Sequence, residues 1–308
     1  MELIRGLHNL KNQTGCALTI GNFDGVHVGH QEIIKKLVST AKNLNVPSLV
    51  VSFSVTPESF FGRPKARLSS FRDKHLYLKS LGVDKHLLIR FNGEFSQISA
   101  HSFIEDVLVK KIKVKYCYVG DDFRFGKDRL GDCDMLQEHS IGHGFTVERV
   151  AGVSIDNKRV SSSAIRKLLS LGDFQTAEKL LGRPFAISGR VAHGDKQGRT
   201  IGFPTANISI RRNLSPVLGV FSVLIKINNI NYKGVCNVGK RPTLGGLKVL
   251  LEVFIFDFNQ EIYGSYVTVF FKQKCREEIK FNSLEELKNQ IKEDVKDSKQ
   301  YFKDARVD

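Results

Sequence analysis

The chain has 308 residues, too long for one comfortable hydrophobic core, so its length predicts two domains. Hydrophobic residues make up 41% of it and charged residues 26%, and no stretch approaches the roughly 20 apolar residues of a membrane-spanning helix. The N-terminus, "MELIRGLHNLKNQTG", lacks a long apolar core and a small-residue cleavage site. We therefore expect neither export nor association with a membrane.

The net charge of +15 fits either a nucleic-acid-binding protein or a protein that handles polyphosphate ligands. The densest basic clusters, "VKKIKVK" at 109–115 and "IRR" at 210–212, are short. A solvated basic surface is therefore favoured over a nucleic-acid site, and we expect no nucleic-acid partner.

The cysteines are scattered singly, with no C-x-x-C pair. Such a set is typical of a protein in a reducing cytoplasm, which is the location that we expect. It also argues against a structural zinc site built from clustered thiolates. The five positions are Cys16, Cys117, Cys133, Cys236 and Cys275.

The first half of the chain alternates strand-like and helix-like segments. Apolar residues recur at helical spacing after His30, and a second helix is expected over 101–112. Strands that alternate with helices of this size predict right-handed βαβ units and a parallel sheet covered on both faces. The predicted strands lie at 16–20, 46–53, 85–91, 115–120 and 145–150.

The pattern changes near residue 183, after two short predicted helices at 162–170 and 173–181. From there to about residue 272 the chain is rich in strands separated by Gly, Asn and Pro turns. Asn228 and Asn229 predict a hairpin turn, because Asn tolerates positive φ. We expect an α/β domain at 1–183 and a β-barrel-like domain with a C-terminal helix at 184–308.

The final helix opens with Ser283 three residues before Glu286, a capping-box pattern. Its apolar residues recur at helical spacing and predict one buried face. That face comprises Leu284, Leu287, Ile291 and Val295.

The segment "GNFDGVHVGH" at 21–30 lies where the first strand turns into the first helix. Ligands bind at this edge of a parallel sheet, and a helix N-terminus favours phosphate. Gly21, Gly25 and Gly29 allow the backbone to approach a bulky anion. His27 and His30, one helical turn apart, can donate hydrogen bonds to phosphoryl oxygens as negative charge builds. Two other interpretations stay open, namely half of a metal site or ordinary polar residues at a helix start.

Three further segments carry groups suited to phosphates or to a bound ring. "GDDFRFG" at 120–126 follows a strand, so it also reaches the ligand edge of the sheet. "RVSSSAIR" at 159–166 combines hydroxyl groups with two arginines, and it can equally be a helix N-cap with solvated arginines. "GRVAHGDKQGRTIGFPTANI" at 189–208 is a flexible cationic loop that leads to Thr205 and Asn207. Their side-chain oxygens are hard ligands of the kind that Mg²⁺ accepts.

A fourth segment, "GVCNVGKR" at 234–241, matches G-x-x-x-x-G-K but is not a P-loop. It ends in Arg241, where a P-loop needs Ser or Thr, and Pro242 follows inside a β-rich region instead of a helix.

Together these motifs resemble a known family. The 21–30 segment is similar to the HxGH signature of nucleotidyltransferases, and the whole set, in this order, resembles the bacterial bifunctional riboflavin kinase/FMN adenylyltransferase (FAD synthetase) family from about residue 14 to about residue 295. The resemblance implies a Rossmann-like nucleotidyltransferase domain followed by a six-stranded riboflavin kinase barrel. It also implies that ATP phosphorylates riboflavin to FMN, and that a second ATP adenylylates FMN to give FAD and pyrophosphate.

The resemblance also implies roles for individual residues. The implied catalytic residues are His27, His30 and Glu252. The implied ATP-binding residues of the adenylyltransferase are Gly21, Phe23, Asp24, Gly25, His27, His30, Arg159, Ser162, Ser163 and Arg166. Its implied flavin-binding residues are Asp122, Phe123 and Phe125. The implied nucleotide-binding residues of the kinase are Gly194, Lys196, Gly198, Arg199, Thr205 and Asn207, of which Thr205 and Asn207 hold Mg²⁺.

The chain departs from the family pattern at two places. "SFSVTPESFF" at 52–61 has Ser-Val-Thr where the family has Glu-Pro-His, so no site residue is nominated there. Phe254 replaces a histidine that usually follows the catalytic glutamate, which leaves Glu252 as the expected base. Strand alternation sets Glu252 on the face opposite Leu251 and Val253, an unusual position for a carboxylate without a function or a partner.

Two rival functions remain open at this point. An HxGH nucleotidyltransferase for another phosphorylated vitamin, such as phosphopantetheine, would have no use for the second domain. A nucleic-acid-binding protein with a degenerate enzyme core would bind polynucleotides in a salt-dependent manner and would not turn over flavin.

Overall fold

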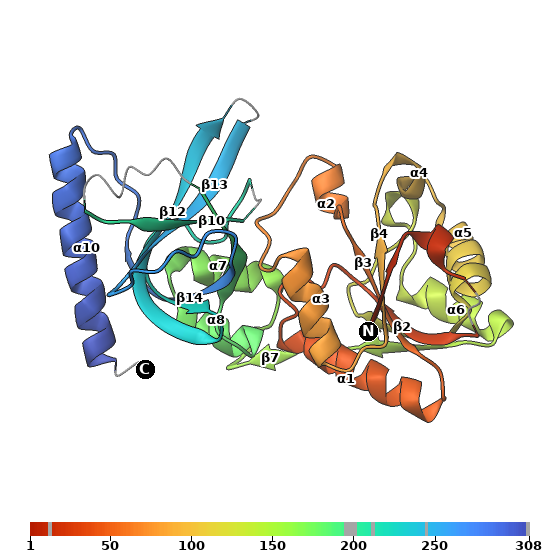
Figure 1. The fold of residues 1–308 in the computed structure, drawn as a ribbon. Coiled ribbons are helices and arrows are strands. Elements are labelled where there is room, and N and C mark those ends of the chain that lie inside the picture. The colour runs from red at the N-terminus through yellow and green to blue at the C-terminus, as the bar shows by residue number, and fades with distance from the viewer. Residues whose placement is uncertain (12–13, 194–201, 211–212, 244–245, 306–308) are drawn as a thin grey trace. The chain divides into compact units, whose positions relative to one another are not determined.

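The computed structural model describes residues 1–11, 14–193, 202–210, 213–243 and 246–305 (Figure 1). Contacts along the backbone divide the chain into two compact units. The first comprises Met1–Lys65 and Phe71–Ser162, and the second comprises Ala66–Ser70 and Ser163–Asp308. The boundary that we expect between residues 183 and 184 concerns activity and stays a prediction.

The first unit is built on a six-stranded sheet in which every strand runs parallel to its neighbours, in the order β1-β4-β3-β2-β5-β6. The central strand β2 is buried along its whole length, as expected when both faces of a parallel sheet are covered. Five strands confirm the predicted runs, whereas the edge strand β1 is absent from the prediction because it has only four residues. The strands are β1 (Glu2–Arg5), β2 (Cys16–Ile20), β3 (Ser48–Phe53), β4 (Lys85–Ile89), β5 (Val114–Gly120) and β6 (Thr146–Val150).

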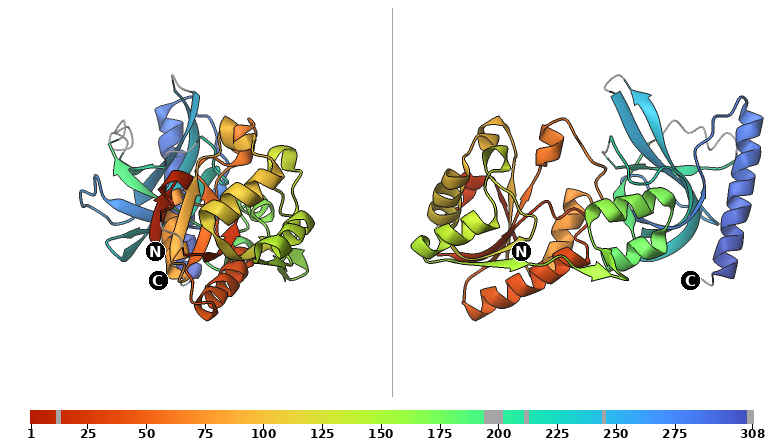
Figure 2. Two further views of the ribbon diagram at one scale, coloured as in Figure 1. Left: turned by 90° about the vertical axis from the view of Figure 1, so that its right-hand side faces the viewer. Right: turned by 180° about the vertical axis from the view of Figure 1, so that it is seen from behind.

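Helices cover both faces of this sheet, which confirms the predicted α/β architecture (Figures 1 and 2). On one face α1 (Val28–Asn43) and α3 (Phe71–Ser80) bury a cluster that includes Ile34, Leu37 and Leu78. On the other face η2 (Phe103–Ile112) and α6 (Cys133–His143) bury a cluster that includes Ile104, Leu108 and Leu136. The smaller elements are η1 (Leu7–Asn9), α2 (Pro57–Phe60), α4 (Gly93–Ser96), α5 (Ala100–Ser102), η3 (Lys127–Arg129), β7 (Ser154–Ile155) and β8 (Lys158–Arg159).

The helix expected over 101–112 is present, but its hydrogen bonding is unusual. The short α5 leads directly into η2, whose ten residues form a π-helix. Wider π-type turns are rare and occur frequently at functional sites.

The second unit is built on a closed antiparallel barrel with the strand order β10-β13-β12-β11-β14-β9. Closure leaves no exposed sheet edge, and it fixes which side chains stand beside one another. The predicted hairpin turn is confirmed, since Asn228 and Asn229 adopt positive φ between the paired residues Ile227 and Ile230. The strands are β9 (Ala186–Ala192), β10 (Thr205–Ser209), β11 (Gly219–Ile227), β12 (Ile230–Thr243), β13 (Gly246–Ile255) and β14 (Tyr266–Arg276).

Within the described part of the chain, three helices accompany the barrel. α7 (Ser162–Leu171) and α8 (Phe174–Leu181) precede it, and Phe174 packs against Phe221 and Phe271. α10 (Leu284–Asp304) follows the last strand and lies against the barrel (Figures 1 and 2).

The N-terminus of α10 agrees with the prediction, but its buried face does not. The backbone N–H of Glu286 donates to Oγ of Ser283 at 3.1 Å, as in the expected cap. The prediction that Leu284 is buried is wrong, because its side chain is 68% exposed in the first turn of the helix. The most buried residues of α10 are Asp294, Ser298 and Phe302. Two of these side chains are polar, so a search for apolar residues at helical spacing could not predict that they face the barrel.

Among the helices of the described ranges, none combines the length and apolar character needed to cross a membrane.

One buried histidine makes the stability of the first unit depend on pH. His86 on β4 is fully buried, with Nε2 2.7 Å from Oγ of Ser52 and Nδ1 3.1 Å from Nδ1 of His75. Burial, followed by the charges of Lys74 and His75, lowers the pKa of His86 to about 3. The folded state therefore holds this imidazole neutral where the unfolded chain takes up a proton.

We predict that the free energy of unfolding of the first unit falls as the pH drops from about 6.5 toward about 3, because the unfolded state then binds more protons. His86→Gln should reduce the slope by up to about 1.4 kcal/mol per pH unit. Some slope should remain, since the pKa values of His30 and His75 are also lowered. Hydrogen exchange of β3 and β4 peptides in urea, corrected for the intrinsic rate at each pH, measures the effect. The exposed His8→Gln serves as the control, and an unchanged slope in His86→Gln would contradict the prediction.

Candidate active sites

The first candidate site is the sharp bend between β2 and α1. Positive φ angles at Phe23, Gly25 and Val26 turn the chain within a few residues of the strand end. The bend delivers His27 to the N-cap of α1, where its Nδ1 accepts a hydrogen bond from the backbone N–H of His30 at 3.4 Å. Because Nδ1 is an acceptor, the neutral ring of His27 carries its proton on Nε2.

The two predicted histidines are stacked on each other. Their ring centroids lie 3.6 Å apart with an interplanar angle of 16°, and the buried ring of Phe23 packs on His30 at 5.0 Å. The pKa of His30 is held well below its usual range, first by burial and then by the neighbouring His27 and Lys74. His30 is therefore a neutral imidazole near pH 7, able to act through a hydrogen bond without carrying a charge.

Two buried polar atoms in this bend have no hydrogen-bond partner among the described residues. They are Nδ1 of His30 and Oδ1 of Asn22. Buried polar groups in folded proteins nearly always have a hydrogen-bond partner. Two such atoms without one, at the ligand edge of a parallel sheet, indicate a place where a bound molecule supplies the hydrogen-bond partners.

Other predicted residues of the first unit meet one another near the same loops. Oγ of Ser162 donates to the carbonyl oxygen of Asp24 at 3.0 Å, which brings the start of the 162–166 segment to the histidine motif. Nη2 of Arg159 lies 2.9 Å from Oδ1 of Asp121 and 3.8 Å from Oδ2 of Asp122. Arg159 is thus brought to the predicted flavin segment.

The two aromatic residues of the flavin segment differ in burial. Phe123 and Phe125 stack at 5.5 Å, but Phe125 belongs to the core and packs on Phe103 at 5.3 Å. Phe123 is only partly buried. Phe123 therefore has the more accessible ring, and Phe125 packs against it on the side of the core.

Two predicted nucleotide-binding residues, Ser163 and Arg166, are assigned to the second unit. Nε of Arg166 donates to the carbonyl oxygen of Ala66 at 2.6 Å within that unit. Their contact with ATP stays a prediction.

Sequence reasoning missed Lys74. It lies on α3 with only 8% of its surface exposed, and its Nζ donates to the carbonyl oxygen of Asn22 at 2.9 Å. It thereby fixes the backbone of the bend from the neighbouring helix. The sequence did hold one signal, because Lys74 lies four residues before Leu78 and therefore on the same, buried face of α3. A lysine on a buried face is rare and indicates a specific partner.

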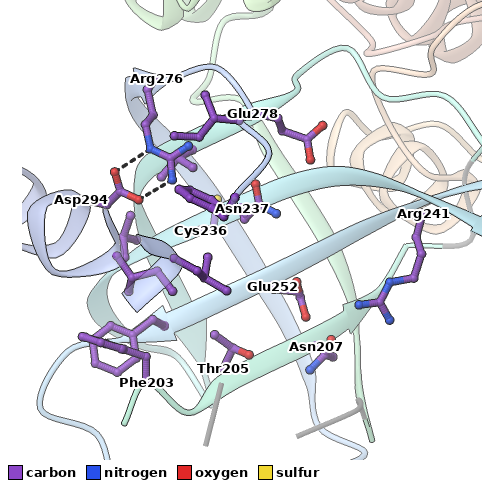
Figure 3. A pocket seen from close by; sticks show the side chains of 17 residues that line it. Phe203, Thr205, Asn207, Cys236, Asn237, Arg241, Glu252, Arg276, Glu278 and Asp294 are labelled. Carbon is purple, nitrogen blue, oxygen red and sulfur yellow. Dashed lines mark hydrogen bonds and ion pairs between the residues drawn. The ribbon is translucent and has the colours of Figure 1, made fainter. Parts of the chain in front are cut away.

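The second candidate site is a cavity of about 220 Å³ inside the second unit (Figure 3). Strand pairing sets Glu252 of β13 directly between Asn207 of β10 and Asn237 of β12. Thr205 lies two residues before Asn207, and both of these predicted residues line the cavity together with Glu252. The structure thus brings together three of the residues predicted for this site.

The cavity has ends of different character. Arg241 lines the cavity together with Glu252 and Asn207 (Figure 3). The apolar lining residues include Phe203, Phe254 and Ile291. Such a cavity suits an amphipathic molecule with an aromatic body and a polar chain. Four other predicted residues, Gly194, Lys196, Gly198 and Arg199, lie outside the described residues.

A buried ion pair closes the cavity on the side of α10. Nε and Nη2 of Arg276 donate to the two carboxylate oxygens of Asp294 at 2.8 and 2.7 Å, and Nε2 of Gln290 donates to Asp294 at 3.1 Å. The Arg276 guanidinium also lies 5.8 Å from the ring centroid of Phe281. Bidentate pairing of this kind ties α10 to β14.

Comparisons with known proteins match each part of the chain to a family. Residues 9–164 match the family model of FAD synthetase, and residues 181–302 match that of riboflavin kinase. The bifunctional riboflavin kinase/FMN adenylyltransferase of Haemophilus influenzae is 48% identical over 98% of this chain and 99% of its own length. The protein of the same description from Escherichia coli K12 is 45% identical over 98% of both chains. A crystal structure described as a macrolide-efflux protein from Streptococcus pneumoniae has 30% identity, a TM-score of 0.78, and covers 96% of this chain and 97% of its own.

The fold and the sites define a two-domain protein, with a Rossmann-like nucleotidyltransferase domain followed by a kinase barrel. The chain belongs to the bifunctional riboflavin kinase/FMN adenylyltransferase family.

We predict that removing the charge of Asp294 destabilises the barrel, because Arg276 is left largely buried without its partner. Asp294→Ala should lower the free energy of unfolding by about 3 kcal/mol. Asp257→Ala, which removes a 90% exposed carboxylate 4.0 Å from Lys299, should change it by less than about 0.5 kcal/mol. Differential scanning calorimetry compares the two variants, and equal melting temperatures would show that the buried pair adds no stability.

Proposed function

We propose that this chain makes FAD from riboflavin in two ATP-dependent steps, one in each domain. Residues 184–308 transfer the γ-phosphoryl group of ATP to the 5′-hydroxyl of riboflavin and give FMN. Residues 1–183 then join FMN to the adenylyl group of a second ATP and release pyrophosphate. The observation that supports the proposal is that each of the two matched family domains holds its own group of polar side chains predicted to contact phosphates.

In the adenylyl transfer, an oxygen of the FMN phosphate attacks the α-phosphorus of ATP, and the bond to pyrophosphate breaks. The protein contributes alignment and stabilisation of the negative charge that develops on the α-phosphoryl oxygens. The Nε2 proton of His27, the neutral ring of His30 and the N-terminus of α1 are the donors that we assign to this charge. Because neither imidazole needs to be cationic, this stabilisation persists above the usual pKa of histidine.

We assign the remaining residues of this site by their positions. Ser162 holds the loop at Asp24, and Arg159 balances phosphate charge close to the flavin segment. Phe123 stacks on the isoalloxazine ring with Phe125 behind it, and Asp122 accepts hydrogen bonds from the ribityl chain. For Ser163 and Arg166 the assignment rests on the family resemblance alone, which gives them a hydroxyl and a positive charge for the ATP phosphates.

In the kinase step, the 5′-hydroxyl oxygen attacks the γ-phosphorus of ATP and its proton passes to a base. Glu252 is that base, because its carboxylate lies on the polar side of the cavity beside two amide side chains, Asn207 and Asn237. Arg241 lines the same cavity and offsets negative charge on the phosphates. The replacement of the expected histidine by Phe254 adds apolar surface next to this base.

Mg²⁺ is the metal that we propose for this step, since Thr205, Asn207 and Glu252 supply hydroxyl, amide and carboxylate oxygens around one cavity. When bound through Thr205 and Asn207, Mg²⁺ would offset the repulsion between the phosphates and the attacking oxygen. We also propose a cytoplasmic location, because the five cysteines are free thiols and four of them are buried.

We predict that His30→Ala slows FAD formation from supplied FMN by about a hundredfold or more, as the loss of one transition-state donor does. His27→Ala should have an effect of at least that size, since His27 also caps α1. Formation of FMN from riboflavin should be unchanged in both variants. Chromatographic analysis of products from purified protein with riboflavin, ATP and Mg²⁺ measures both reactions, with His8→Ala as the control. Equal loss of the two activities would argue against separate sites.

We predict that Glu252→Gln lowers kcat for FMN formation by roughly a hundredfold to ten-thousandfold, because it keeps the side-chain volume but cannot accept a proton. Thr205→Ala should instead raise the apparent KM for ATP and the Mg²⁺ requirement, because it removes an oxygen ligand. Steady-state kinetics at varied ATP and Mg²⁺ separates the two effects, and both variants should still adenylylate supplied FMN. Normal phosphorylation of riboflavin by Glu252→Gln would leave Glu252 a structural partner in the barrel.

A further inference from the structure

Four potential metal ligands lie on the helices that cover one face of the sheet of the first unit. His101 and Glu105 are four residues apart on α5 and η2, and His139 and His143 are four residues apart on α6. Residues with this spacing project from one side of a helix, so each helix presents two ligands to its neighbour. None of the four belongs to the residues assigned above to adenylyl transfer.

The fold brings these side chains together. One ligand atom from each of His101, Glu105 and His139 lies within 4.8 Å of the other two. The rings of His101 and His139 meet edge to face with centroids 5.1 Å apart, and Nε2 of His143 lies 2.5 Å from Oε1 of Glu105. Ligand atoms at about 2.0–2.1 Å from a tetrahedral zinc ion lie roughly 3.4 Å apart, so small side-chain rotations would close this set around an ion.

The backbone that carries the ligands is held in place by the core. Ile104 and Leu108 of η2 and Leu136 of α6 are fully buried in one cluster. Glu105 lies next to Ile104, in the π-helical segment. The site is thus built on packed helices, which hold ligands more precisely than loops do.

We propose that His101, Glu105, His139 and His143 form a binding site for a divalent transition-metal ion of the Zn²⁺ type. Three imidazoles and one carboxylate suit Zn²⁺, and also Co²⁺ and Ni²⁺, whereas Mg²⁺ prefers oxygen ligands. His143 joins the ion as a fourth ligand by exchanging its contact with Glu105 for the metal. This site needs no thiolate, so the scattered cysteines do not bear on it.

The ion would stabilise the part of the fold that supports the 120–131 loop. Gly126 of this loop lies against Ala100 at the start of α5, where an added Cβ would come within 2.6 Å of the Ala100 Cα. The backbone N–H of Lys127 donates to the carbonyl oxygen of Ile98 at 2.7 Å, and Phe125 pairs with Gly131 just before α6. A metal that links α5 and η2 to α6 therefore braces the middle of this loop and its C-terminal end.

The test uses the full-length protein, freed of metal with a chelator and studied without nucleotide. Titration with Zn²⁺ against a chromophoric chelator should find a site of low micromolar affinity or tighter, and Zn²⁺ should raise the melting temperature. The double variant His101→Ala/His139→Ala should lose at least about tenfold in affinity and lose the thermal shift. His8→Ala/His193→Ala, which removes two exposed imidazoles elsewhere, should behave as the wild type. Co²⁺ in place of Zn²⁺ should give the visible absorption of a tetrahedral site in the wild type.

Glu105→Gln is a second variant that keeps side-chain volume, and it should also weaken Zn²⁺ binding by at least about tenfold. Circular dichroism and FAD formation without added Zn²⁺ establish that each variant is folded. The proposal is overturned if the wild type binds no Zn²⁺ at micromolar concentrations, or if folded His101→Ala/His139→Ala binds it as tightly as the wild type does.

Discussion

Closure of the barrel fixes the register between β10, β13 and β12, and this register decides which side chains line the cavity of the second unit. Asn207, Glu252 and Asn237 occupy the same level on three adjacent strands. Because side chains alternate along a strand, a shift of one residue would turn Glu252 toward the core and Leu251 toward the cavity. The Glu252 carboxylate is therefore held by the hydrogen bonds of the whole barrel, and the C-terminal helix is held against the same barrel by the buried pair of Arg276 and Asp294.

In the first unit, the side chains of the candidate site are positioned by a helix N-terminus and not by strand register. Its histidines sit at a helix N-terminus, where the backbone supplies a partial positive charge and burial keeps His30 neutral. Buried Lys74 adds a full charge behind the bend through its contact with the carbonyl oxygen of Asn22. The first unit thus places imidazoles at a helix N-terminus, whereas the second lines its cavity with hydroxyl, amide and carboxylate oxygens.

The sequence predicted most of the architecture because the pattern of each element agrees with its surroundings. β2 reads as a continuous apolar run because both of its faces are covered, and the hairpin at Asn228 and Asn229 uses residues that tolerate positive φ. The prediction was wrong for Leu284, since helical periodicity does not show where a helix extends beyond the surface that it packs on. The polar buried face of α10 could not be predicted either, because Asp294 and Ser298 are buried through hydrogen bonds to residues on strands far away in the sequence.

The candidate sites were predicted less completely, and the reason is again long-range contact. His27, His30, Thr205 and Asn207 belong to short local motifs, so the sequence alone was enough to nominate them. Lys74 acts through a residue 52 positions away, and Arg276 through one 18 positions away, so neither forms a local motif.

The cluster of His101, Glu105, His139 and His143 on α5, η2 and α6 also depends on long-range contacts that the sequence does not show. It bears in addition on which metal ions the chain would bind. Each pair of ligands has helical spacing, yet the two pairs come together only because both helices cover one face of the sheet. Its imidazoles and the oxygen atoms around Glu252 differ in softness, so the two places would sort metal ions by ligand chemistry. An ion held by three imidazoles would not compete for the oxygen-lined cavity, and Mg²⁺ at cellular concentrations would not fill the imidazole site. On the two proposals together, a single chain would keep a metal that braces its fold apart from a metal that serves phosphoryl transfer.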